Sequence, residues 1–401
     1  MSSERERVHS VQPPVVAGSP QFHERTSTAM IMWFTVLCLS PAALWGTYVY
    51  GWRALGVIAV SVAASVVCEF LIVRFLFGRD RKVENPAGRT ELLRPRNAGT
   101  LRDGSAALTG LLIGMTMPPA VPLYVPIVAA VFALAVVKWT FGGLGTNWMN
   151  PALAARVFVY FSWTPQMTSW TMPKPLLGMP AGGTVDAIAA ATPLGLIKTH
   201  VVTGMIAADG PMSLLRQAGY PRSAFDGNVT EWLNAHILVH LGANLPGGYV
   251  DLFVGNIPGA IGEGSVLLLL LGSVFMFGRR IISWEIPASY FFSFAFFEWI
   301  FGGTLYHTGF FSGDVLFSVC TGGFVLALFY MATDPVTSPM SSSGMVVYGT
   351  GVGILTFLIR TFGSIPEGVA LAIIFMNMFV PLINRVTTPR RYGVRAGGEA
   401  A

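Results

Sequence analysis

Charged side chains are scarce in this sequence. Asp, Glu, Lys and Arg make up 11% of its 401 residues, whereas soluble domains carry about 25%. Hydrophobic residues make up 53%, and several apolar runs approach the roughly 20 residues that cross the hydrocarbon core of a bilayer. The composition therefore excludes an ordinary soluble domain and indicates an integral membrane protein.

Cysteine is also rare, and the patterns of metal and nucleotide sites are missing. The three cysteines lie singly within apolar runs, without the paired spacing of a disulfide frame or a metal site. The six histidines show no ligand spacing either. Neither an iron–sulfur ligand set nor a nucleotide-binding glycine loop is present, so we expect no metal site in this chain.

The positive charge gathers in loops next to the apolar runs, so it predicts membrane orientation and no nucleic-acid binding. Seven basic residues lie between 78 and 104, which places this interval in the cytoplasm. Counting spans from there places both termini in the cytoplasm and residues 165–261 outside. The polar residues 1–28 lack the apolar core and cleavage site of a signal peptide, so we expect the first apolar run to remain as an anchor.

Ten apolar stretches are predicted to span the membrane, five on each side of the external interval. They cover residues 29–49, 54–77, 105–119, 121–140, 149–164, 262–280, 285–304, 312–332, 344–362 and 366–385. The third and fifth are short and rich in Gly and Pro, which predicts broken helices that line a site.

The fold class is therefore all-α, with about ten transmembrane helices in two five-helix halves. An odd number of spans per half means that repeated halves would be inverted. The predicted regions are a cytoplasmic arm at 1–28, membrane halves at 29–164 and 262–385, the external interval at 165–261 and a cytoplasmic tail at 386–401.

Thr192 and Pro193 carry the signature of a helix start within the external interval. Threonine is a common N-cap, and proline is tolerated at the first helical position. A helix N-terminus also presents unpaired N–H groups that suit a phosphate. The turn is therefore either a simple cap or a phosphate site that shares the threonine hydroxyl.

The segment around Thr192, VDAIAAATPLG, resembles the flavin-attachment segment of the D subunit of Rnf complexes and of the B subunit of the sodium-pumping NADH:quinone reductase. LTGLLIGMTMPPAVPLY, FGGLGTNWMNPALAARVFVYF, LFVGNIPGAIGEGS, FYMATDPVTSP and IPEGVALAIIFMNMFVPLINR resemble segments of the same family in the same order. The similarity covers about residues 20–393. The short N-terminal arm and the ending PLINRVTTPRRYG are more similar to the Rnf D subunit.

The resemblance implies a membrane subunit that takes part in electron transfer between reduced ferredoxin and NAD, coupled to transport of Na⁺ or H⁺ across a bacterial inner membrane. It implies FMN joined to Thr192 by a phosphodiester, with Asp186 and Pro193 in the attachment segment. The family usually has Ser or Asp, then Gly, then Ala or Ser before the threonine, whereas residues 189–191 here are all alanine.

The resemblance also implies partners. Other subunits of the complex would supply the iron–sulfur clusters and the nicotinamide site, and a flavin transferase would attach the FMN. No side chain of this chain is expected to be catalytic, because flavins carry the electrons and the protein positions them.

Asn147 and Asn150 lie at the start of the fifth predicted span. Three residues apart on a helix, they would share one face, and amides within a membrane are costly unless paired. Either they hold a broken helix to its neighbours or they bind a ligand. The resemblance implies the ligand, a second, noncovalent flavin (riboflavin or FMN).

Glu69 and Asp334 are candidates for an ion pathway, because acidic residues inside membrane spans are rare and usually functional. For Glu69 the alternative is a buried ion pair with Arg74. For Asp334, at the end of the eighth span, it is an ordinary cap.

Two other functions remain open at this point. One is that of the B subunit in a Na⁺-translocating NADH:quinone reductase. The other is that of a flavin-free channel or transporter, because inverted five-span halves with broken helices also occur in such proteins.

Overall fold

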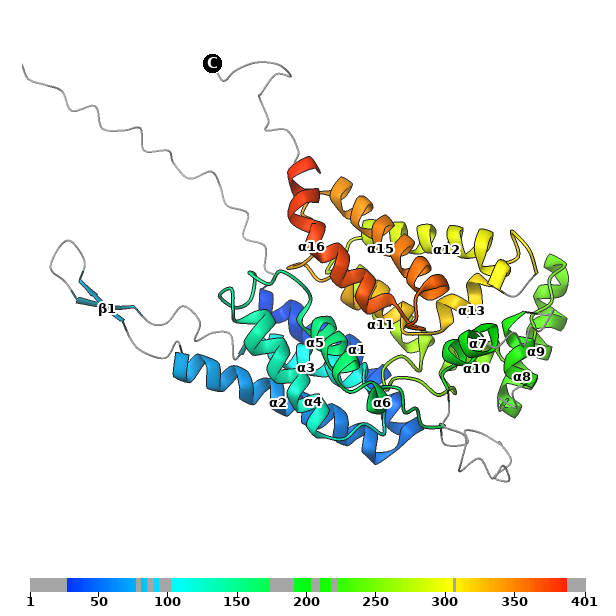
Figure 1. Ribbon diagram of the computed structural model, residues 1–401, viewed down its shortest axis with the longest axis horizontal. Helices are drawn as coiled ribbons and strands as arrows, with labels where there is room; N and C mark the ends of the chain where they lie inside the picture. Colours follow the sequence, from blue (N-terminus) through cyan, green and yellow to red (C-terminus); the bar gives the residue numbers. More distant parts are fainter. Residues whose placement is uncertain are drawn as a thin grey trace, which may run out of the picture.

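The computed structural model describes residues 27–76, 81–84, 90–93, 102–173, 191–202, 210–217, 222–305 and 308–387. This part of the chain is helical (Figure 1) apart from one antiparallel hairpin of β1 (Arg81–Glu84) and β2 (Thr90–Leu93). The hairpin lies in the basic interval, where the sequence indicated only a loop. The predicted all-helical, multi-span class is confirmed for the membrane part.

Helices occupy all ten predicted spans. In the first half they are α1 (Thr28–Tyr50), α2 (Trp52–Leu76), α3 (Ser105–Met115), α4 (Tyr124–Val131) continued by the π-helix η2 (Phe132–Lys138), and α5 (Pro151–Ser162). In the second half they are α11 (Val266–Gly278), α12 (Glu285–Leu305), α13 (Val315–Cys320), α14 (Phe324–Leu326) continued by the π-helix η4 (Ala327–Met331), α15 (Ser342–Phe362) and α16 (Val369–Thr387). Four of them, α1, α2, α15 and α16, are long and apolar enough to cross a membrane by themselves.

The broken helices have local causes. Helix α3 is only 11 residues long and is followed by Pro118 and Pro119, and α5 starts at Pro151 with Asn150 as its cap. The eighth span is interrupted too, between α13 and α14. There Gly322 and Gly323 both have positive φ, 62° and 66°, a conformation that glycine adopts easily and that cannot continue a right-handed helix.

The two halves have matching internal contacts. Helix α2 packs against α4 in the first half as α12 packs against α15 in the second, and α4 packs against α5 as α15 packs against α16. The halves meet through their first helices, α1 and α11, and through their fifth helices, α5 and α16. This matched packing supports two equivalent halves, and their inverted orientation stays a prediction.

The external interval contributes short helices that gather at one end of the molecule (Figure 1). They are α6 (Thr164–Met167), α7 (Pro193–Val202), α8 (Pro211–Gln217), α9 (Ala224–His236), the 3₁₀-helix η3 (Leu238–Leu241) and α10 (Tyr249–Val254). The β1–β2 hairpin lies toward the opposite end. This separation supports the prediction that the basic interval and residues 165–261 face opposite sides of the membrane.

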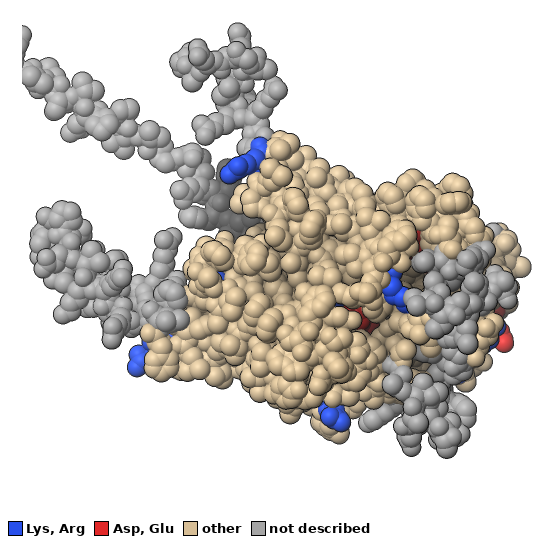
Figure 2. All heavy atoms as spheres, in the orientation of Figure 1, with Lys and Arg blue, Asp and Glu red and all other residues tan. Residues whose placement is uncertain are grey.

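The described surface between these ends carries few charged side chains (Figure 2). Large apolar side chains point outward there, among them Leu37, Phe75, Val274 and Phe292. Such a surface is stable against lipid and unfavourable against water. Polar and charged side chains that are buried between the helices are therefore the candidates for functional residues.

Candidate functional site

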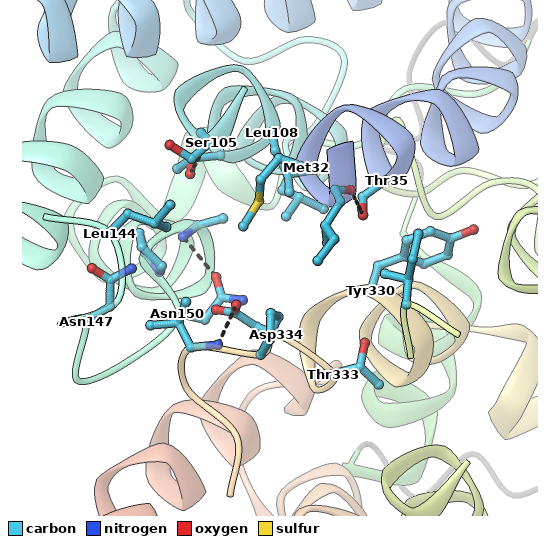
Figure 3. Close-up of a pocket in the computed structure, with 18 of the residues that line it drawn as sticks. Met32, Thr35, Ser105, Leu108, Leu144, Asn147, Asn150, Tyr330, Thr333 and Asp334 are labelled. Carbon is cyan, nitrogen blue, oxygen red and sulfur yellow. Dashed lines mark hydrogen bonds between the residues drawn. The ribbon is translucent and has the colours of Figure 1, made fainter. Parts of the chain in front are cut away.

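Two pockets lie next to each other along α5. The first, here named the amide pocket, is bounded by α1, α3, η2, the segment before α5, the end of α11 and residues 330–336. Figure 3 shows Asn147 and Asn150, from the segment before α5, and Asp334, which follows η4, around its cavity. The structure therefore brings together three of the site residues that the sequence predicts.

The two asparagines have different roles in this pocket. Asn150 caps α5, because its Oδ1 accepts from the N–H groups of Ala152 and Leu153 at 3.1 and 3.3 Å, and its Nδ2 donates to Met331 O at 3.3 Å. Asn147 Oδ1 is buried and has no hydrogen-bond partner in the part of the chain that the structure describes. An orphaned buried acceptor is costly, and it is typical of a site that binds a donor.

The helical spacing expected for these asparagines is wrong. Helix α5 begins at Pro151, so Asn147 and Asn150 both precede it. Pro151 at the first helical position and Asn150 as the cap set this start. Both asparagines line the pocket because the segment before the helix borders it, and not because they share a helix face.

Asp334 ends a turn directly after η4. Its carboxylate accepts from Val336 N at 3.2 Å and from Thr337 Oγ1 at 3.1 Å. The capping alternative is therefore observed. Asp334 also lines the amide pocket, so a cap and a role in an ion pathway are compatible, and the second stays a prediction.

Glu69 forms a buried ion pair, but with Lys138 and not with Arg74. Lys138 Nζ lies 2.8 and 3.0 Å from the two carboxylate oxygens of Glu69 and donates to Ser105 Oγ at 2.7 Å. Both charged side chains are almost fully buried, whereas Arg74 is exposed. Lys138 also lines the amide pocket, so Glu69 lies one side chain behind it.

The second pocket, here named the arginine pocket, is lined by Arg156 and Tyr160 of α5, Gly322 and Gly323 at the helix break, and Glu367 before α16. Arg156 is mostly buried and forms ion pairs with Glu263, at 3.0 Å, and with Glu367. The cluster joins the first half to the second, because Arg156 belongs to α5 and both carboxylates come from segments that flank helices of the second half.

Arg360 holds the break in the eighth span together. Its guanidinium donates to the carbonyl oxygens of Ser318, Thr321 and Gly322 at 2.6, 3.1 and 3.1 Å. These carbonyls end α13, where a helix offers unsatisfied acceptors and partial negative charge. Arg360 Nε also donates to Glu367 O at 3.0 Å, which fixes the wall of the arginine pocket.

Thr192 and Pro193 start α7, as the sequence predicts. Thr192 Oγ1 accepts from Gly195 N at 3.1 Å, and the Thr192 carbonyl accepts from Leu196 N at 2.8 Å. The Thr192 side chain is buried, at 6% exposure. Asp186, the other residue expected in the attachment segment, lies outside the described residues.

Helix α7 lies against the arginine pocket. A Cβ atom placed on Gly322 would be 3.1 Å from Leu194 Cδ2. Lys198 Nζ donates to the carbonyl oxygens of Arg360 and Ile365, at 2.9 and 3.0 Å, and more distantly to that of Ile359. Burial, and then the positive charge of Arg360, lower the pKa of Lys198 to about 8, so it still donates as an ammonium at neutral pH.

Six residues separate Asn150 in the amide pocket from Arg156 in the arginine pocket, a rise of about 9 Å along α5. The two pockets also share η4, since Tyr330 lines the first and Met331 the second. The two pockets therefore have two helices in common.

Three buried basic residues were missed from the sequence: Lys138 and Arg156, which line the two pockets, and Arg360, which binds the carbonyls at the helix break. Each lies within a predicted span. The rule that singled out Glu69 and Asp334, that ionisable residues inside spans are functional candidates, applies equally to cations and identifies all three.

The chain matches a family model described as the NQR2, RnfD, RnfE family over residues 15–393. It is 35% identical over 380 residues to the D subunit of the proton-translocating ferredoxin:NAD(+) oxidoreductase complex of Clostridium ljungdahlii, covering 95% of this chain and 96% of that protein. It is 34% identical over 381 residues to the D subunit of the Na(+)-translocating ferredoxin:NAD(+) oxidoreductase complex of Acetobacterium woodii, covering 94% and 95%. It is also 34% identical over 399 residues to the D subunit of the ion-translocating oxidoreductase complex of Stutzerimonas stutzeri, covering 94% and 95%.

Proposed function

The chain belongs to the NQR2, RnfD, RnfE family, and on that premise we propose that it is the D subunit of an Rnf-type complex that couples electron transfer between ferredoxin and NAD to ion transport across a bacterial inner membrane. The observation that carries this proposal is the end-to-end match to relatives with that name. Those relatives are named for H⁺ in one case and Na⁺ in another, so either ion fits.

The start of α7 suits a covalent FMN on Thr192. The threonine Oγ1 lies at the N-terminus of a ten-residue helix, where backbone N–H groups and the helix dipole favour a phosphodiester. After esterification, Thr192 Oγ1 still accepts the hydrogen bond from the Gly195 N–H. The neighbouring arginine pocket has about 30 Å³ of free space, so it would have to widen to take the ring, which Tyr160 and Phe161 would then hold.

The amide pocket fits the second, noncovalent flavin. Its apolar walls include Met32, Leu108 and Leu112, and the orphaned Asn147 Oδ1 is free to accept from a ring N–H. The enclosed space is about 70 Å³ as the side chains stand, so a flavin enters only when flexible side chains such as Met32 move aside.

A bound flavin supplies redox chemistry that no side chain of this chain provides. The residues that would hold the two flavins, Asn150 and Arg156, are six residues apart on the same helical segment, a rise of about 9 Å. Asp334 and Lys138 line the amide pocket, and Glu69 pairs with Lys138 behind it. These charges would respond to a change of charge on a bound flavin, which would couple ion movement to electron transfer.

The proposal is tested with the purified complex in liposomes, by measuring ferredoxin-dependent NAD reduction and the accompanying ion uptake. We expect both activities, and their loss when this subunit is omitted. Quinone reduction without ferredoxin activity would instead assign the chain to the quinone-reductase branch of the family. A colourless protein that conducts a solute without any redox partner would assign it to a channel or transporter.

Replacing Asn147 by leucine is expected to lower the affinity for the noncovalent flavin about 5- to 30-fold, because one hydrogen bond of about 1–2 kcal/mol is lost to a side chain of similar size. Flavin released by denaturation, compared with flavin that stays with the chain, measures this effect. Asn228→Leu, at an exposed position of α9, is the control and is expected to change nothing. Unchanged release from Asn147→Leu would remove Asn147 from the flavin site.

A further inference from the structure

The side chain proposed to carry FMN is inaccessible in the folded chain. Thr192 is 6% exposed, and its hydroxyl oxygen faces the N–H of Gly195 within the first turn of α7. A flavin transferase must bring this oxygen into line with a phosphorus atom in its own active site. A buried oxygen at a docked helix end does not allow that approach, so the start of α7 must leave this position before the transferase can act.

The contacts described for α7 include a polar anchor and an apolar side. Lys198 Nζ donates to three carbonyls, two at the C-terminal end of α15 and one just after it. Ile197 is 3% exposed and belongs to the hydrophobic core, against which Leu194 and Leu196 also pack, and α7 contacts α8 as well. Local opening of one ten-residue helix costs less free energy than unfolding of the whole chain.

We propose that FMN is attached to Thr192 while α7 is undocked from α15, and that docking of α7 through Lys198 is the closing step of maturation. This inference rests on the proposed function of Thr192 and adds the order of events. It makes α7 the helix that must move, and Lys198 the residue that sets how readily it moves.

The covalent step balances without any further reactant than an activated flavin nucleotide, such as flavin adenine dinucleotide. Thr192 Oγ1 attacks the phosphorus that bears the riboflavin moiety, and the new Oγ1–P bond replaces the bridging P–O bond. AMP leaves with the electron pair of that bond, and the hydroxyl proton is released. The product keeps one negative charge on the phosphodiester, which suits the N-terminus of α7 once this helix has docked.

The inference is tested with the full chain made in nanodiscs and with the transferase added at different times. One sample receives the transferase and flavin adenine dinucleotide during synthesis, and a second receives them after the chain has folded. In-gel flavin fluorescence and the mass of the Thr192 peptide are followed with time. We expect attachment during synthesis to be complete and attachment after folding to be slower by at least about tenfold.

The variant Lys198→Met tests whether undocking of α7 limits the rate of attachment. It keeps the length of the side chain and removes the hydrogen bonds from a charged donor. We expect it to accelerate attachment after folding about tenfold or more, because loss of a single hydrogen bond from a charged group is enough for a change of that size. Arg216→Met, which removes an exposed positive charge from the neighbouring α8, is the matched control and is expected to leave the slow rate unchanged.

The possible outcomes distinguish the inference about α7 from the proposed attachment of FMN at Thr192. Equal rates during synthesis and after folding would overturn the inference, and so would a Lys198→Met chain that reacts as slowly as the folded wild type. Absence of covalent flavin even when the transferase is present during synthesis would instead refute the proposed attachment at Thr192.

Discussion

Thr192→Ala is expected to remove all covalently bound flavin from the chain and to abolish ferredoxin-dependent NAD reduction by the complex. Without a hydroxyl no phosphodiester forms, so the arginine pocket receives no flavin. The fold should survive, since loss of a threonine N-cap costs about 1 kcal/mol. The measurement is the mass of the peptide that contains residue 192, in which wild type should carry one FMN less water, together with the NAD reduction rate.

Two further substitutions separate the hydroxyl from the cap. Asparagine caps helices at least as well as threonine, so Thr192→Asn should fold like wild type and still lack flavin and activity. Thr192→Ser keeps both hydroxyl and cap and is the conservative control. If Thr192→Asn retained full electron transfer, Thr192 would be a helix cap only, and the flavin would have to be held elsewhere.

Lys138→Met is expected to destabilise the folded chain by about 3–5 kcal/mol, because it takes the ammonium away from a carboxylate that stays buried. Glu69 is fully buried and accepts two short hydrogen bonds from Lys138. The free energy of unfolding in mixed detergent micelles, taken from a denaturant titration, measures the effect. Arg74→Met is the control, because Arg74 is the exposed cation nearest to Glu69 in sequence, and it should change stability by less than about 0.5 kcal/mol.

The double variant Glu69→Gln/Lys138→Met tests whether charge pairing is the cause. It removes both charges and keeps side chains of similar size, so most of the stability should return. A coupling energy near zero in this double-mutant cycle would contradict the ion pair. Equal losses for Lys138→Met and Arg74→Met would contradict it as well. If the double variant folds but no longer transports ions, the pair contributes to the ion pathway as well as to stability.

Hydropathy alone located the ten helical segments, because a bilayer requires long apolar stretches whose backbone groups are satisfied within each helix. The start of α7 at Thr192 and Pro193 was also predictable, since capping acts over a single turn. Asn147 and Asn150 show the limit of such local reasoning. Their spacing predicted a shared helix face, but Pro151 starts the helix after them, so they line one pocket for a different reason from the one expected.

The sequence by itself determined the membrane class, the positions of the spans and the threonine that starts the external helix, because each depends on residues within one helix or one turn. Only the tertiary structure decided which charges meet. Lys138 reaches Glu69 across 69 residues, and Arg156 reaches Glu263 and Glu367 across 107 and 211 residues. Helical spacing relates residues three or four apart, whereas the first pair depends on packing within the first half and the other two on packing between the halves. The same packing places the amide pocket and the arginine pocket side by side.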